Sequence, residues 1–212
     1  MKTKILLSVI ILFFIVGTTN AQINKDRILL GGGINYNSTS NPNQQSFYSN
    51  LQIGKVIKEN TVVGLIGGYS SNTSSYNNGS PVKARSYSAG VFYRKYKRFL
   101  SDFYFFGEVD GSYNFSNNIQ ESYNSGLYLN SKSRGATISF VPGVAYAVCK
   151  RMQMELSMPS FASLSYAHSV TIDNSLPAGV SPQKRNTYGA GINLNSNLLY
   201  NFAIGFKFLL GK

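Results

Sequence analysis

Apolar and polar residues alternate with a period of two over most of this sequence. A period of two is that of a β-strand whose two faces meet different surroundings. The clearest example lies near the C-terminus, where one face would carry Tyr200, Phe202, Ile204, Phe206 and Phe208, and the other Asn201, Ala203, Gly205 and Lys207. Only 13% of the residues are charged and 20 are glycine, which does not suit a coiled coil or a helical repeat. The sequence therefore predicts an all-β protein.

Eight strands are predicted, and the connections between them alternate in length. The strands are expected at residues 27–37, 46–57, 61–71, 84–96, 103–115, 134–147, 152–168 and 187–209. The connections 38–45, 72–83, 116–133 and 169–186 are long and polar, whereas 58–60, 97–102 and 148–151 are short. A soluble sandwich has no reason to alternate in this way, but a barrel inserted from one side of a membrane does. We therefore expect a single eight-stranded antiparallel up-and-down transmembrane β-barrel.

The eighth predicted strand is longer than one crossing of a bilayer requires. About 10 residues are enough for a crossing strand, yet the alternation continues from Tyr188 to Phe208. We expect the upper part of this strand, together with the upper part of the seventh, to project beyond the membrane. A turn at Asn195–Asn197 is the competing interpretation.

The first 21 residues are typical of a secretory signal peptide. Lys2 and Lys4 precede an apolar run over residues 5–16, and small residues follow before Gln22. The apolar run is too short for a membrane-spanning helix, which needs about 20 residues. We expect residues 1–21 to be removed and residues 22–212 to form the barrel domain of an exported protein.

The face opposite the aromatic residues is expected to line the lumen. It carries mainly Gly, Ser, Asn and Thr, which fit the interior of a narrow barrel. Its few charges are expected to form ion pairs, with Arg94 near Glu108 or Asp110, because unpaired charges in the lumen would be costly. The predicted set is Arg94, Glu108, Asp110, Glu155 and Lys207. A lumen filled by side chains does not suit bulk porin transport.

The basic residues fall into two groups at opposite ends of the predicted strands. Three long connections end in a basic pair: Lys83 and Arg85, Lys132 and Arg134, Lys184 and Arg185. The second group is Lys55, Lys58, Lys95, Lys97, Arg98, Lys150 and Arg151. Both groups suit the phosphates of lipid head groups. Nucleic acid is not an expected partner, because the charge is split between two rims and no nucleic-acid-binding motif is present.

Three segments resemble the small outer-membrane β-barrel family of Gram-negative bacteria, the OmpX-like and OmpA-barrel-like proteins. They are TTNAQ at the end of the signal, FVPGVAYAVCKRMQMELSM around the turn from the sixth to the seventh strand, and the terminal YNFAIGFKFLL. The resemblance implies a location in the outer membrane, with lipopolysaccharide phosphates near the six loop-end bases as a possible collar. It also implies insertion by the barrel-assembly machinery, which in this family recognises the last strand. The positions that match this assembly signal are Gly205, Phe206, Phe208 and Leu210.

Two other functional classes remain as alternatives. A soluble exported lipocalin-like barrel would turn the aromatic face inward and bind a small hydrophobic ligand. A lipid-A-modifying barrel enzyme would use His168 with Ser165, Ser169 and Asp173, but catalysis needs a nucleophile within hydrogen-bond reach of its base. Here Ser169 is adjacent to His168 and the predicted eighth strand has no acid. We therefore expect no enzyme activity, and with one His and one Cys in the chain, no metal or cofactor.

Overall fold

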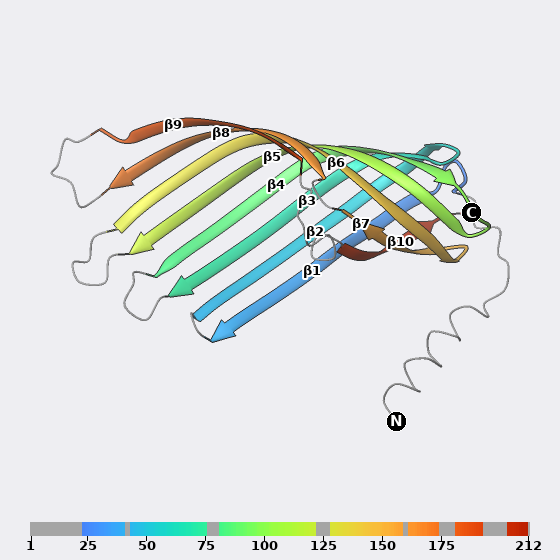
Figure 1. The fold of residues 1–212 in the computed structure, drawn as a ribbon, viewed down its shortest axis with the longest axis horizontal. Helices are drawn as coiled ribbons and strands as arrows, with labels where there is room; N and C mark the ends of the chain where they lie inside the picture. The colour runs from blue at the N-terminus through green and yellow to red at the C-terminus, as the bar shows by residue number, and fades with distance from the viewer. Residues whose placement is uncertain are drawn as a thin grey trace, which may run out of the picture.

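The computed structural model describes residues 23–40, 43–75, 81–121, 128–158, 161–173, 181–192 and 203–211. Regular structure in these residues consists of β-strands (Figure 1). The strands are β1 (Ile28–Ser40), β2 (Asn43–Lys58), β3 (Thr61–Ser75), β4 (Val82–Arg98), β5 (Phe103–Glu121), β6 (Tyr128–Cys149), β7 (Met152–Ser157), β8 (Ala162–Asp173), β9 (Gln183–Ile192) and β10 (Ala203–Leu210).

Eight of these strands form a closed antiparallel barrel, which confirms the predicted number of strands and the predicted all-β barrel architecture. Strands β1 to β6 pair in sequence order, β6 pairs with β7, and β7 pairs with β10. Pairing of β10 with β1 closes the ring, with Ile28 opposite Leu210. We call the end with the short connections 59–60, 99–102 and 150–151 the turn end, and the opposite end the loop end.

The predicted seventh strand is interrupted between β7 and β8, so its predicted continuity was wrong. The predicted eighth strand falls on β9 and β10, and residues 193–202 between them lie outside the described residues. From Gly143 onward β6 pairs with β7, whereas up to Phe140 it pairs with β8. Pro142 lies where the partner changes, and its carbonyl accepts a hydrogen bond from the Met158 amide at 3.0 Å. Proline has no N–H to donate to the sheet, which suits this position. The turn considered at Asn195–Asn197 lies outside the described residues.

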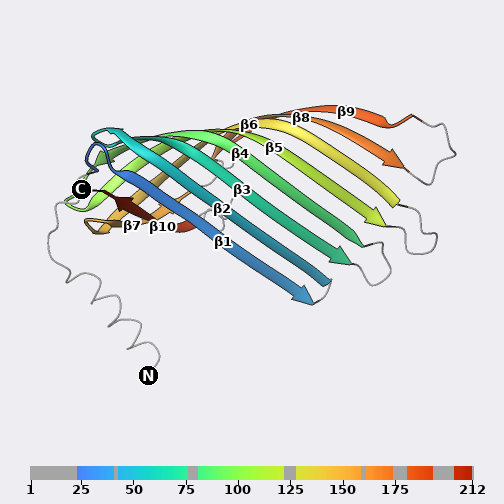
Figure 2. The ribbon, with the colours of Figure 1, turned by 180° about the vertical axis from the view of Figure 1, so that it is seen from behind.

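In the described residues, the barrel is closed at the turn end, whereas β1 and β9 are the edges of the sheet toward the loop end. In the described part of the chain, β9 pairs only with β8, and β1 beyond Gly32 pairs only with β2. Figures 1 and 2 show β1 and β9 at opposite edges of the same strongly curved sheet. This edge arrangement accounts for the high exposure of Ile34 and Tyr188, 78% and 77%.

Much of the chain predicted as long loops is strand instead. β5 continues to Glu121 and β8 to Asp173, well into the predicted connections 116–133 and 169–186. Polar side chains bridge these strand extensions: Ser169 donates to Ser133 at 3.2 Å, and Thr171 to Ser131 at 3.1 Å. Because both faces are polar there, the period-two signal disappears from the sequence although the strands continue.

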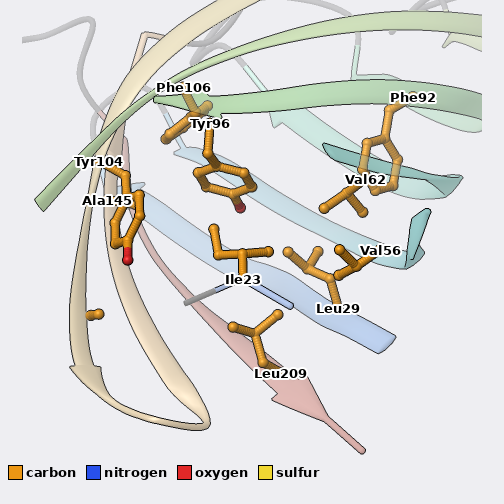
Figure 3. Close-up of a cluster of buried hydrophobic side chains, with 11 residues drawn as sticks. Ile23, Leu29, Val56, Val62, Phe92, Tyr96, Tyr104, Phe106, Ala145 and Leu209 are labelled. Atoms are coloured by element: carbon orange, nitrogen blue, oxygen red, sulfur yellow. The ribbon is translucent and has the colours of Figure 1, made fainter. Parts of the chain in front are cut away.

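The turn end of the lumen is filled by an apolar cluster, where the sequence predicted mainly small polar residues (Figure 3). Ile23, from the segment before β1, lies in the middle between Tyr96 and Leu209. Its carbonyl is held by the Asn60 amide at 3.1 Å. The cluster comprises Ile23, Leu29, Val56, Val62, Phe92, Tyr96, Tyr104, Phe106, Ala145, Ala147 and Leu209.

Glycines on the inner face make room for these large rings. A Cβ on Gly64 would lie 2.6 Å from the Phe92 ring and would overlap the Ile53 carbonyl oxygen. A Cβ on Gly143 would overlap the Phe106 ring in the same way. Glycines on neighbouring strands therefore make room for Phe92 and Phe106 in the lumen.

Candidate functional site

The centre of the lumen is a buried charge network built around Arg94 on β4. Its Nε donates to Oε2 of Glu108 on β5 at 2.6 Å, and its Nη1 donates to Oε1 of Glu155 on β7 at 2.5 Å. The same nitrogen reaches the Tyr96 hydroxyl at 3.0 Å, and the guanidinium lies 4.4 Å from the centre of the Phe106 ring. All three charged side chains are at most 5% exposed. Charge-assisted hydrogen bonds of this geometry are the strong kind.

The network extends to two further strands through Gln52 on β2. The Gln52 amide donates to Oε1 of Glu108 at 2.9 Å, and its oxygen accepts from the Lys207 ammonium on β10. The structure thus brings together Arg94, Glu108, Glu155 and Lys207 of the predicted set. Asp110 lies on the same face of β5, but its Oδ1 is buried without a hydrogen-bond partner.

Sequence reasoning missed Gln52 and Tyr96 as members of the network. Both alternate with outward-facing neighbours, so the period of two was the signal that could have found them. Each carboxylate of the ion pairs already binds at least one donor. The arrangement therefore suits a fixed plug across the lumen, rather than paired acids poised for catalysis.

The outer face of the barrel is apolar between its two ends. Its large apolar residues are exposed, the inverse of a water-soluble fold. They include Ile34, Leu51, Ile53, Val63, Leu65, Val91, Val109, Ile138, Met154, Leu156 and Ile204. From Leu30 to Tyr36 on β1, Leu51 to Ile53 on β2, and Tyr87 to Tyr93 on β4, the outward positions carry no charge.

Aromatic residues lie at both borders of this apolar face. At the turn end Phe99 stacks on Phe105 with ring centres 4.2 Å apart, and Phe103 lies 4.7 Å from Tyr146. At the loop end the ring centres of Tyr69 and Tyr87 are 5.2 Å apart, and those of Tyr166 and Tyr188 are 5.1 Å apart. Two aromatic borders with an apolar band between them are typical of membrane barrels.

The six predicted loop-end bases are not evenly spread. Arg85, Lys132 and Lys184 lie in one register row, that is, in one line of paired residues that crosses the strands on the outer face. From β4 to β9 this row consists of Arg85, Asn117, Lys132, Val170 and Lys184. Lys83 and Arg134 share this face, while Arg185 pairs with inward-facing Ser169. Residues 28–54 and 61–75, which cover β1, β3 and most of β2, contain no Lys or Arg. The bases therefore form a one-sided group from β4 to β9 instead of a complete collar.

At the turn end, two basic residues contact neighbouring polar groups. The Lys55 ammonium lies 3.4 Å from the Asp26 carboxylate, and Arg27 donates to the Lys150 carbonyl at 2.8 Å. Cys149 is a free, half-buried cysteine at the end of β6. In the last strand, Phe206, Phe208 and Leu210 of the predicted assembly signal point outward, and Gly205 faces the lumen opposite Glu155.

The residues considered for catalysis do not come together. Nδ1 of His168 lies 2.7 Å from Oδ1 of Asn186, on the outer face. Ser165 and Ser169 are on the opposite face of β8, and Ser169 is bonded to Ser133. The described residues contain no group of three or more His, Cys, Asp or Glu arranged to hold a metal ion.

Neither the protein-family models nor the curated proteins include a match to this sequence. In the described part of the chain, no helix is both long enough and apolar enough to span a membrane. The expected signal peptide, residues 1–21, lies outside the described residues.

Proposed function

We propose that the protein is an integral outer-membrane β-barrel with a closed lumen, which supports the envelope or presents its loop-end strands to surface partners. The observation that carries this proposal is the uncharged apolar outer face, bordered by aromatic residues and then by bases at each end. A monomeric soluble protein rarely exposes apolar patches beyond a few hundred Å².

The height of the apolar band suits a bilayer. Phe105 and Phe115 both point outward from β5 and mark its two borders. Ten residues of strand span about 33 Å, and a tilt of about 40° converts this to a height of about 25 Å. That is the height of the apolar band of outer-membrane barrels.

A structural or surface-interaction role follows from the shape of the interior. Among the described residues, the network around Arg94 and the apolar cluster beneath it fill the turn end of the lumen, which does not suit bulk transport. Strands such as β5 and β6, with 19 and 22 residues, exceed the about 10 that a crossing needs. Their loop-end parts would therefore stand outside the membrane, rich in the Ser, Asn and Tyr that suit adaptable binding.

The lipocalin-like alternative requires the aromatic face to point inward. The outward exposure of that face, and the charges in the lumen, argue against it. The enzyme alternative is not supported by the geometry, because Ser165 and Ser169 lie on the face of β8 opposite to His168. We retain the proposal of a non-enzymatic barrel that requires no cofactor.

Expression of the full chain in a Gram-negative host tests the proposal. We expect the protein in the outer-membrane fraction, extractable only with detergent, with Gln22 as its first residue. Unboiled samples should migrate differently from boiled samples on an SDS gel, because a closed barrel resists SDS. A protein that remains in the soluble fraction after lysis, without a heat-dependent shift, would contradict the proposal.

A further inference from the structure

One part of the outer face is hollowed. A groove of about 620 Å³ lies on β5, β6, β8 and β9, within the range of small-molecule sites. The large side chains that line it are between 39% and 67% exposed. These large side chains are Val109, Ile138, Phe140, Leu164 and Ile192, and the smaller Ala190 also lines the groove.

The same four strands carry aromatic residues next to the groove, on its loop-end side. Tyr113, Ala136, Tyr166 and Tyr188 form the next outward register row. The rings of Tyr166 and Tyr188 are 5.1 Å apart and tilted by 40°. Tyrosine pairs of this kind suit the boundary between acyl chains and head groups, because the ring is apolar and the hydroxyl is polar.

Bases follow in the next two outward rows. Arg134 lies opposite Phe115 and His168, with its guanidinium 5.9 Å from the Phe115 ring centre. One row further, Lys132 and Lys184 are separated by β8 alone. Two strand spacings amount to about 10 Å, so their long side chains are able to approach one anionic group from both sides.

The distances along the strands match one lipid molecule. Arg134 is six residues from Phe140 on β6, which corresponds to about 20 Å of strand. Groove, tyrosines and bases therefore follow the order of acyl chain, ester region and head group. The outer faces of β1 to β3 at the loop end lack the bases.

We propose that the outer face of β5, β6, β8 and β9 binds one phospholipid whose phosphate head group carries a net negative charge. Its phosphate lies among Lys132, Arg134 and Lys184, and one acyl chain occupies the groove. Guanidinium and ammonium groups are the usual partners of phosphate. The inference rests on the proposed membrane location, and it replaces a general collar by a single defined site.

Binding is measured on the full chain purified in dodecyl maltoside, by native mass spectrometry with dioleoylphosphatidic acid as the probe. We expect one bound lipid per barrel, held about tenfold more tightly than dioleoylphosphatidylcholine or dioleoylglycerol. Inorganic phosphate serves as a second comparison. Equal binding of phosphatidic acid and phosphatidylcholine overturns the inference, and so does phosphate binding as tight as that of the lipid.

The chain offers a matched pair of charge variants. K132Q/R134Q at the loop end and K95Q/K97Q at the turn end each remove two positive charges spaced two residues apart on the outer face. We expect the first to weaken binding about tenfold, and the second by less than about twofold, as remote surface charges do. Equal losses of lipid affinity in the two variants would indicate that general surface charge attracts the lipid, and would overturn the proposed site.

A second pair tests the groove. Ala190→Trp should fill it and weaken lipid binding, while Ala89→Trp, also exposed on the outer face but on β4, should not. Equal binding by both Trp variants overturns the placement of the acyl chain.

The heat-dependent gel shift checks that every variant is folded. A wild type soluble without detergent contradicts the proposed function, whereas a detergent-requiring barrel without lipid preference contradicts this inference alone.

Discussion

Arg94 on β4 and Glu155 on β7 form an ion pair of 2.5 Å across the barrel, between strands that are not neighbours. With the 2.6 Å pair to Glu108, it joins three walls of the lumen through one guanidinium. Removing two carboxylates and an arginine from water is costly, and only good hydrogen-bond geometry offsets that cost. The pair therefore fixes how the barrel closes rather than adding much net stability.

Removal of Arg94 alone should be strongly destabilising. Arg94→Leu leaves Glu108 and Glu155 buried without their main partner, and the loss of one partner of a buried pair typically costs about 3–5 kcal/mol. The triple variant Arg94→Leu, Glu108→Gln, Glu155→Gln removes all the charges of these two pairs and should recover most of the loss. Urea unfolding of the detergent-solubilised barrel, followed by circular dichroism, measures both. A triple variant less stable than the single variant would contradict this account.

Gly64 should not tolerate a methyl group. A Cβ there meets backbone atoms of the neighbouring strand and the Phe92 ring. Because backbone cannot move aside easily, Gly64→Ala should cost on the order of 1–3 kcal/mol, as overpacking does. Gly111→Ala is the control, since nothing lies within 4 Å of a Cβ there, and it should change stability by less than about 0.5 kcal/mol. Equal unfolding midpoints for both variants would show that β2 and β3 separate more readily than the packing implies.

The alternation of residues, together with the alternating lengths of the connections, predicted the closed eight-stranded barrel, and the alternation predicted the inward direction of Arg94, Glu108 and Lys207. Arg94 and Glu108 flank one short turn, so a hairpin alone brings them together. Glu155 depends on ring closure, which no local pattern encodes. The division of the predicted seventh strand was missed because β6 changes partner at Pro142, and a partner change leaves the alternation on β6 itself intact.

The apolar cluster was missed for a different reason. Sequence assigned one polarity to each face along a whole strand, but the inner face changes from polar to apolar toward the turn end. Phe92 and Tyr96 lie on the same face as Arg94, which stands between them on β4. Ile23 precedes the first predicted strand, so no periodic pattern places it in the lumen.

The lumen plug should block ion flow, and removing aromatic residues from it should allow flow. Tyr96 and Phe106 have ring centres 5.7 Å apart inside the barrel. We expect the wild type to be silent in planar bilayers and Tyr96→Ala with Phe106→Ala to give channel openings, because the substitutions empty the centre of the cluster. Tyr93→Ala with Phe105→Ala removes outward-facing rings from the same two strands and should remain silent. Large steady conductance of the wild type would contradict a closed lumen.

Amide hydrogen exchange should differ between the two parts of β1. Residues 28–32 pair with strands on both sides, whereas residues 33–40 pair only with β2 in the described part of the chain. In an antiparallel strand alternate amides point to opposite neighbours, so about half of those in residues 33–40 and in β9 should exchange rapidly. Exchange in detergent micelles, read by mass spectrometry, measures this with β4 and β5 as protected references. Uniform protection along β1 would show that another part of the chain covers its edge.

Substitution of the outward aromatic residues of β10 should reduce assembly in the cell by more than the loss of their apolar surface area alone would. Phe206 and Phe208 are 48% and 44% exposed and sit two residues apart near the C-terminus. If they serve as the assembly signal, Phe206→Ser with Phe208→Ser should sharply lower the amount of barrel in the outer membrane. The matched variant Phe103→Ser with Phe105→Ser removes two comparable outward rings from β5 and should lower it much less. Both variants should refold in detergent to a similar extent, since lipid-facing area alone decides that reaction. Equal losses in cells would mean that β10 contributes only apolar surface, and that its aromatic residues carry no separate signal.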